Sequence, residues 1–228
     1  MAHIIEERKR TMAALWKHFR DGGWGMYPIV FWSILTIGII IERALYLFGS
    51  SINKDVFLAT MQKCILAGDV AKAVKMCSAA NAPLARIVQA GLVKVNRPDE
   101  EVQAAMDEAA LRELPKISKR TGYLALLANL SMLSGLLGTV SGLIQSFGAV
   151  SGESVDPSQK ARILAEGISE AMNCTAFGLI VAIMGLIGFA ILNGKTQGLE
   201  DDINESSVQV LNLVVTNRQK VNLGGVPQ

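Results

Sequence analysis

Charge is scarce in this chain: only 18% of its residues are Asp, Glu, Lys or Arg, whereas 50% are hydrophobic. With a mean hydropathy of +0.34, this balance is too apolar for an ordinary soluble domain. The net charge of +2 comes without a basic patch interleaved with aromatic residues, so nucleic acid is not an expected partner. The composition therefore predicts a membrane protein in contact with lipid.

Cysteine and histidine are also few, with three and two copies. Cys64, Cys77 and Cys174 have neither the spacing of a zinc site nor that of a disulfide framework, so we expect reduced thiols. The chain lacks a phosphate-binding loop and a convincing set of nucleophile, base or metal ligands. We therefore expect no enzyme, no metal site and no cofactor.

Three windows, 22–41, 121–152 and 171–194, contain no formal charge. Each is long enough for a helix that crosses about 30 Å of hydrocarbon. Because these runs are contiguous rather than alternating, and because a backbone in lipid must satisfy its own hydrogen bonds, they favour helices over a barrel. The predicted fold is all-α: an integral membrane protein with three transmembrane helices, two of them extending into a large cytoplasmic helical bundle.

The distribution of Lys and Arg predicts the orientation. Placing residues 49–122 and the C-terminus in the cytosol puts 14 of these residues there and 7 on the other side, which favours N-out and C-in. Five basic residues within 1–20 argue the other way. The first apolar run is too long for a secretory signal, and Glu42 and Arg43 follow it directly, so we expect an uncleaved span.

Helix caps and prolines divide the long polar segment. Asp69 is placed to cap one helix, Pro83 and Pro98 to begin two others, and Pro115 to kink the last, which we expect to continue into the second span. The predicted organisation is an N-terminal interfacial helix (1–22), a first span (23–49), a cytoplasmic helical domain (50–120), a second span (121–150), a periplasmic connection (151–167), a third span (168–194) and a cytoplasmic helix and tail (195–228).

The second span contains SGLLGTVSGLIQSF at 134–147, an uncharged, hydrophobic segment with many small and polar side chains. Residues three or four apart share a helix face, and here they are Ser131, Gly135, Thr139, Gly142 and Ser146. The third span repeats the pattern with Ala171, Thr175, Gly178, Ala182 and Gly185. Close helix packing explains such stripes, because lipid supplies no hydrophobic drive between helices. The alternative is a wetted pore or a face for a partner helix, which the matched threonines favour.

Several motifs together resemble the MotA/TolQ/ExbB proton channel family, closest to its three-span TolQ/ExbB branch. They are LSGLLGTVSGLIQSF in the second span, Glu42 and Arg43 after the first, GDVAKAVKMCSAANAPLARIVQAGL in the polar segment, and ISEAMNCTAFGLIVAI in the third span. The resemblance implies that Thr139 and Thr175 line the interior and that Glu170 is an acid beside the pathway. Met184 stands where the family often has proline, which puts a local kink in doubt.

The spans lack a central proton carrier, since no Asp, Glu, His or Lys lies deep in any of them. A proton relay through hydrocarbon needs such a group, so another chain must supply it if protons cross. The resemblance implies a homopentamer around a dimer of TolR/ExbD-like, single-span partners with an intramembrane Asp. Protons would be the coupling ion, and proton motive force would become mechanical work in Tol-Pal maintenance, TonB-type transport or gliding motility.

Two other interpretations stay open. The chain would be a non-conducting membrane scaffold if its stripes only pack helices and its polar domain recruits envelope proteins. It would be a passive channel if it conducted protons alone. For Glu42 and Arg43, a paired charge at the end of a span is an alternative to a relay, and Glu170 is also favoured simply as an acid near a helix start.

Overall fold

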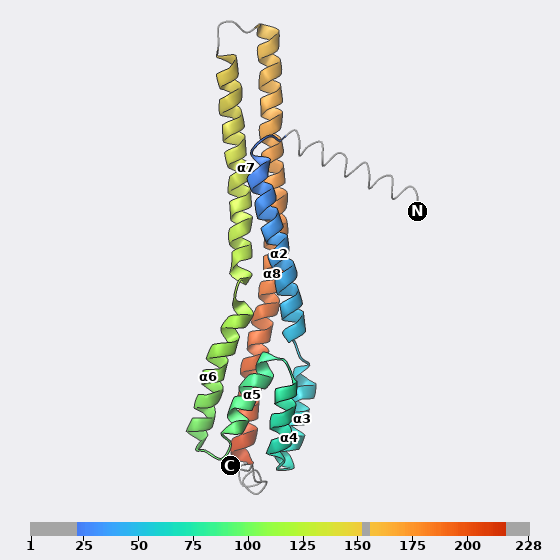
Figure 1. The fold of residues 1–228 in the computed structure, drawn as a ribbon, viewed down its shortest axis with the longest axis vertical. Helices are drawn as coiled ribbons and strands as arrows, with labels where there is room; N and C mark the ends of the chain where they lie inside the picture. Colours follow the sequence, from blue (N-terminus) through green and yellow to red (C-terminus); the bar gives the residue numbers. More distant parts are fainter. Residues whose placement is uncertain (1–21, 152–155, 218–228) are drawn as a thin grey trace, which may run out of the picture. The chain divides into compact units, whose positions relative to one another are not determined.

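The computed structural model describes residues 22–151 and 156–217, which form helices and no strand (Figure 1). Three of these helices are long and apolar enough to cross a membrane. The prediction of an all-α protein with three membrane helices is confirmed. The predicted interfacial helix lies almost entirely outside the described residues, as do residues 152–155 of the connection and the last residues of the tail.

The chain divides into two units. The first, which we call the membrane unit, comprises residues 1–41 and 122–190. The second, which we call the bundle unit, comprises residues 42–121 and 191–228. Two helices, α2 (Met26–Ser50) and α8 (Pro157–Thr216), contribute residues to both units, whereas nearly all of α7 (Thr121–Val150) belongs to the membrane unit.

The helix α8 begins at Pro157, inside the segment predicted as a periplasmic connection, and continues through the third span to Thr216. Proline suits this start, because the first turn of a helix has no partner for its N–H and proline's fixed φ is already helical. The expected extension of the third span into the C-terminal region is therefore a continuous helix.

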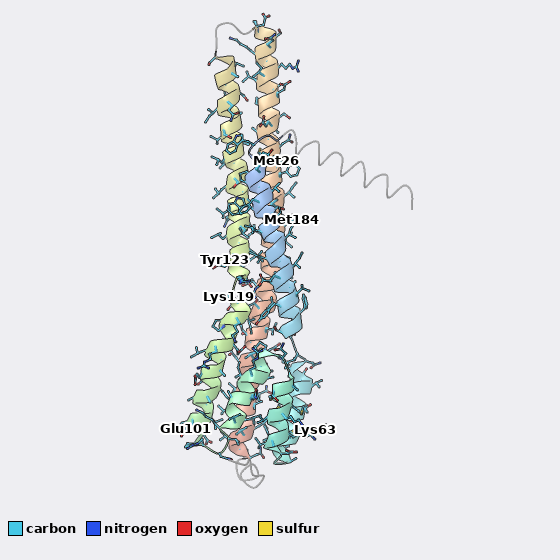
Figure 2. All side chains as sticks on the ribbon, in the orientation of Figure 1. Met26, Lys63, Glu101, Lys119, Tyr123 and Met184 are labelled. Carbon is cyan, nitrogen blue, oxygen red and sulfur yellow. The ribbon has the colours of Figure 1, made fainter. Side chains whose placement is uncertain are left out.

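Most of the apolar surface of the spans is not buried within the chain. In the 18-residue windows that identify the three spans, only 17%, 33% and 28% of the residues are buried. Three residues labelled in Figure 2 illustrate the contrast: Met26 is 2% exposed, whereas Tyr123 and Met184 are 59% and 46% exposed. Lipid or other protein chains must cover the remainder, because water would penalise it.

Local signals determine where the helices of the bundle unit begin. The Asn53 side chain accepts hydrogen bonds from the N–H groups of Asp55 and Val56, which starts α3 (Lys54–Leu66). Asp69 accepts from the Lys72 N–H and starts α4 (Val70–Ala79), as expected from the sequence. Pro83 is the first residue of α5 (Pro83–Val93), and Pro98 precedes α6 (Asp99–Ser118).

Large aliphatic side chains form the core of the bundle unit. The α5 residues Ile87, Val88 and Leu92 are at most 1% exposed. On α8, one face of the helix is buried over its last six turns, through Leu192, Leu199, Ile203, Val210 and Val214. Lys54 on α3 donates to Asp202 at 2.7 Å and to Glu205 at 3.1 Å, and these bonds raise its pKa. This ion-pair cluster connects α3 with α8.

The expected continuous helix from Pro98 into the second span is interrupted. The α6 helix ends at Ser118, α7 begins at Thr121, and Arg120 between them has a φ of +69°. A non-glycine residue in this left-handed region cannot continue a right-handed helix. The prediction of one continuous helix was therefore wrong at this point.

Arg43 provides the physical reason for the interruption. Its Nη2 atom donates to the carbonyl oxygens of Lys116 at 3.2 Å and Ile117 at 3.0 Å. In a continuous helix these carbonyls would accept from the N–H groups four residues later. Glu42 also pairs with Arg120, at 2.7 Å. Within the bundle unit, Glu42 thus acts as a paired charge, and Arg43 satisfies the last carbonyls of α6.

Candidate functional site

The helices α7 and α8 approach each other to backbone contact along the predicted small-residue stripes. A Cβ added to Gly178 would lie 2.8 Å from the Ser131 carbonyl oxygen and 3.0 Å from the Gly135 Cα. A Cβ added to Gly135 would lie 3.0 Å from the Cys174 carbonyl oxygen. A side chain at Gly178 would force the helices to shift, and one at Gly135 would be tighter than almost all ordinary contacts. We call this line of contact the α7–α8 seam.

The seam continues in both directions from these glycines. Gly142 lies against Ala171, where an added Cβ would be 3.3 Å from the Ala171 Cβ, and Ser146 lies against Gly167. In the other direction, Gly185 lies against Ala128. The remaining predicted position, Ala182, is 5% exposed. The structure therefore brings the two predicted stripes together within one chain, in the manner of the close-packing interpretation.

The seam serines are satisfied within their own helix. Ser131 is fully buried and donates to the Leu127 carbonyl at 2.9 Å, and Ser146 donates to the Gly142 carbonyl at 2.7 Å. Such bonds to a carbonyl one turn earlier satisfy a hydroxyl without any partner outside the helix. These two hydroxyls are therefore small, satisfied groups of the packing contact.

Helix α2 covers one side of the seam (Figure 1). A Cβ added to Gly25 would lie 3.0 Å from the Cys174 Sγ and 3.1 Å from the Gly138 Cα. The Trp32 indole N–H donates to the Ser134 hydroxyl at 3.0 Å, so α2 is also hydrogen-bonded to α7. On the α8 side, α2 packs Met26 and Ile29 against Cys174 and Val181.

Thr139 and Thr175 lie on the other side of the seam, away from α2. Each directly follows a residue that faces α2, namely Gly138 and Cys174, and one residue turns the direction by about 100° on a helix. Both threonines are partly exposed. The Thr139 hydroxyl donates to the Leu136 carbonyl at 2.6 Å, and the Thr175 hydroxyl donates across the seam to the Gly135 carbonyl at 3.3 Å.

Glu170 does not join the two threonines. Its carboxylate lies against Gly23, which has a φ of +60° and stands in the turn before α2. A negative charge is favoured there by the unpaired N–H groups at the start of a helix. Within one chain, Glu170 therefore faces α2, whereas the threonines face the side that α2 leaves open.

Sequence reasoning missed the residues that position α2. Gly138 and Cys174 are the close contacts of Gly25, and the Trp32 indole N–H is a hydrogen-bond donor to α7 within the membrane unit. The usable signal was spacing: Gly138 lies seven residues after Ser131 and four after Ser134, on the flank of the seam stripe.

The chemistry available at the open side of the seam is that of hydroxyl groups. Each threonine hydroxyl uses its proton in a bond to a carbonyl, but its oxygen keeps lone pairs that accept from water or from a protonated acid. Among the described residues, no group of three or more His, Cys, Asp or Glu side chains is arranged to hold a metal ion.

Known proteins are similar in sequence to this chain. The model of the MotA/TolQ/ExbB proton channel family matches residues 79–205, more than half of the chain. A putative biopolymer transport protein, ExbB-like 3 of Synechocystis sp., is 30% identical over 73% of this chain and 79% of its own length. The ExbB-like 1 protein of the same organism is 31% identical over 76% of this chain and 68% of its own length.

A shorter match extends the comparison to a second branch of the family. The Tol-Pal system protein TolQ of Haemophilus influenzae is 36% identical over 43% of this chain and 42% of its own length. The family match includes α7 and the part of α8 that forms the seam, and so includes Thr139, Glu170 and Thr175. The chain is therefore a multi-pass membrane protein of the ExbB/TolQ type, and it belongs to the MotA/TolQ/ExbB proton channel family.

Proposed function

We propose that this chain is a subunit of a proton-driven motor in a bacterial inner membrane, oriented N-out and C-in. Copies of the chain, five by family resemblance, form a ring around a dimer of TolR/ExbD-like partners, each with one span and an intramembrane Asp. Proton flow through the ring drives motion of the partner relative to the ring. The partner transmits this work to the cell envelope.

The placement of Thr139 and Thr175 is the observation that carries this proposal. Both lie on the side of the α7–α8 seam that α2 leaves uncovered, and both keep acceptor lone pairs. With α2 toward the lipid, the uncovered side faces the ring axis. There the hydroxyls hydrate or hydrogen-bond the partner's carboxyl group as it gains and loses a proton.

A partner is proposed because the predicted spans contain no titratable group near the middle of the membrane. The only carboxylates in the predicted spans are Glu42, which is paired with Arg120, and Glu170 of α8, whose carboxylate lies against Gly23 in the turn before α2. Neither is suited to carry protons through the middle of the hydrocarbon. A charge that moves through 100 mV releases about 2.3 kcal/mol, so several protons per cycle are enough to drive motion against protein contacts.

The exposed apolar surface supports assembly into a ring. Large side chains are exposed along all three spans, and a Cβ added at the seam glycines already meets backbone of the same chain. The outer faces of α7 and α8, rather than the seam, are thus the surfaces available to neighbouring copies. Their exposed members include Leu133, Leu137, Ile144, Ile180, Ile183 and Ile187.

Replacing Thr139 and Thr175 with valine tests the role of the hydroxyls. Valine keeps the volume and removes the acceptor, so each variant should lower partner-dependent proton flux into proteoliposomes by about tenfold or more, as expected for a lost hydrogen bond to a charged group. Thr36→Val is the matched control, because Thr36 is 2% exposed on α2 and donates to the Trp32 carbonyl. Unchanged flux in both seam variants would refute the proposal for these residues.

The second candidate function is a non-conducting scaffold, favoured by the fact that the seam residues pack within one chain. Co-purification distinguishes it from the motor. A motor subunit should retain a single-span protein with an intramembrane Asp, and vesicles should conduct protons only when both proteins are present. The identity of that partner assigns the process: Tol-Pal maintenance, TonB-type transport or gliding motility. Proton flux from the chain alone would instead indicate a passive channel.

A further inference from the structure

A polar cavity lies at the end of α2, within the bundle unit. It has a volume of about 330 Å³, and its lining includes Leu45, Tyr46, Gly49 and Ser50 of α2, Asn81 before α5, and Arg86 on α5. Everything that lines it belongs to the bundle unit, so the cavity is part of one compact body. The proton pathway proposed above uses none of these residues.

The guanidinium group of Arg86 lines the cavity, where two hydrogen bonds hold it in place and other N–H donors remain available. Arg86 donates to the Asn81 Oδ1 at 2.7 Å and to the Glu113 Oε2 at 3.2 Å, and its side chain is 48% exposed. A guanidinium has five N–H donors, so three remain for a ligand. This fork geometry matches the oxygens of a phosphate group.

The local charge is positive despite the ion pair. Glu113 also accepts from Lys116 at 2.6 Å, so the cluster of Arg86, Glu113 and Lys116 has a net charge of +1. Arg43 adds a second positive charge, with its guanidinium 5.1 Å from the centre of the Tyr46 ring. The ring of Tyr46, which lines the cavity, is thereby held in position.

The depth of the cavity in the membrane identifies the class of ligand. By sequence, the charge-free run of the first span ends at residue 41, and Leu45 and Phe48, one to two turns further along α2, are 72% and 68% exposed and available to the acyl chains of a lipid at the membrane surface. Gly49 and Ser50 follow at the level of lipid headgroups. A positively charged, polar cavity at this level is complementary to a lipid phosphate, with acyl chains along the exposed apolar side chains.

We propose that this cavity binds the headgroup of an anionic glycerophospholipid. The phosphate accepts hydrogen bonds from Arg86, with the hydroxyls of Tyr46 and Ser50 as further donors, and the acyl chains extend along Leu45. Such a lipid connects the C-terminal end of α2 to α5 within the bundle unit. Binding does not depend on proton conduction.

Native mass spectrometry of the full-length, detergent-purified chain tests this proposal. The probes are phosphatidylglycerol and phosphatidylcholine with identical acyl chains, because only the first has a net negative charge. We expect phosphatidylglycerol to bind preferentially, and Arg86→Gln to weaken it at least about tenfold, since charge-assisted hydrogen bonds are lost. Equal binding of the two lipids to the wild-type chain would refute the proposal.

A second variant leaves the charges intact. Gly49→Leu takes up volume beside the cavity, and an added Cβ there meets no atom within 4 Å, so the fold accommodates it. It should weaken phosphatidylglycerol binding to a similar extent. Gly198→Leu is its control, because Gly198 is an equally open helical position outside the cavity. Arg112→Gln is the control for charge, since Arg112 is exposed and pairs with Glu108.

The source of the phosphate is distinguished by competition. Inorganic phosphate and glycerol phosphate should not displace the lipid at millimolar concentration, because they lack acyl chains to contact Leu45. Displacement would assign the cavity to a soluble anion and overturn the lipid assignment. Unchanged lipid binding in both Arg86→Gln and Gly49→Leu would show that phosphatidylglycerol binds elsewhere, and would also overturn it.

Discussion

The membrane unit and the bundle unit are both helical, yet they are held together in opposite ways. In the membrane unit, α7 and α8 meet through glycine, alanine and serine, and their large side chains point away from the contact. In the bundle unit, large side chains such as Leu92 and Ile87 fill the centre, and ion pairs lie on its surface. Helix packing in the membrane unit depends on residues with little or no side chain, whereas packing in the bundle unit depends on large buried side chains.

The surrounding solvent explains this difference. In water, burial of an aliphatic side chain stabilises the fold because apolar surface is removed from water. In lipid that gain is absent, so helices associate through close backbone contact, dispersion and hydrogen bonds. Removing a side chain should therefore harm the bundle unit, and adding one should harm the membrane unit.

The largest effect is expected from removing volume in the bundle unit. Leu92 is 1% exposed, so Leu92→Ala should lower the free energy of unfolding by about 2–5 kcal/mol through lost burial and the cavity it leaves. Thermal unfolding of the purified chain followed by circular dichroism measures this. Leu111→Ala is the control, because Leu111 is 76% exposed on α6. Similar losses in both variants would show that the centre is not the source of stability.

Adding volume in the membrane unit should have the next largest effect. Gly178→Ala places a Cβ 2.8 Å from the Ser131 carbonyl oxygen, which must force α7 and α8 apart at a cost of about 1–3 kcal/mol. Gly148→Ala is the matched control on α7, because a Cβ there meets no atom within 4 Å. Denaturant titration in detergent compares them.

A glycine of the bundle unit sharpens this contrast. A Cβ added to Gly91 would meet the side chain of Met106, with no backbone atom among its nearest contacts. Because methionine has three rotatable bonds and adapts its shape, Gly91→Ala should cost less than Gly178→Ala. The reverse order would mean that backbone contact is not what limits the seam.

Exposed ion pairs of the bundle unit should matter less than its core. Glu42 and Arg120 are 2.7 Å apart, but their side chains are 46% and 49% exposed. Glu42→Gln should therefore cost at most about 1 kcal/mol, and the loss should shrink as salt is added. Unfolding midpoints at low and high ionic strength test this. A large loss of stability that does not change with salt would contradict the assignment of Glu42 and Arg120 as a solvent-screened surface pair.

The smallest effect at neutral pH concerns a buried thiol. Burial raises the pKa of Cys77 from 9.0 to about 11, with a further contribution from nearby Cys64. The folded state therefore holds the proton more tightly, so this stabilisation is complete below pH 9 and is lost as the pH rises to 11. Unfolding midpoints from pH 8 to 11 should fall more steeply in the wild-type chain than in Cys77→Ala.

The reactivity of the same thiol gives a second measurement. With its pKa raised by about two units, Cys77 should be alkylated by iodoacetamide at pH 8 at least about a hundredfold more slowly in the folded chain than in the unfolded chain. Peptide-resolved mass spectrometry separates Cys77 from the other cysteines. Rapid alkylation in the folded chain would show that the region around Cys77 opens readily.

Helix starts in the bundle unit were readable from sequence because their causes are local. The Asp69 cap and the N-terminal Pro83 act on N–H groups within their own first turn. The end of α6 was not readable in this way, because the group that satisfies its last carbonyls is Arg43, more than seventy residues away. Pro115 alone indicated a kink inside the helix, not the break at Arg120.

The candidate site shows the same division. Sequence spacing identified the small residues and the threonines as one stripe on each span, and these stripes do meet. It did not separate them into a centre used for packing and an edge that bears Thr139 and Thr175. That separation depends on α2, which approaches through Gly25 and covers only one side of the seam.

By itself, the sequence determined the all-α class, the three spans and the residues able to make close contact, because these follow from hydropathy and helical period. Only the tertiary structure decided which side of the stripe stays open, that Glu170 lies against the start of α2, and that α6 ends at Ser118, where Arg43 donates to its last carbonyls. Those outcomes depend on contacts between residues far apart in the chain, and no local pattern contains them.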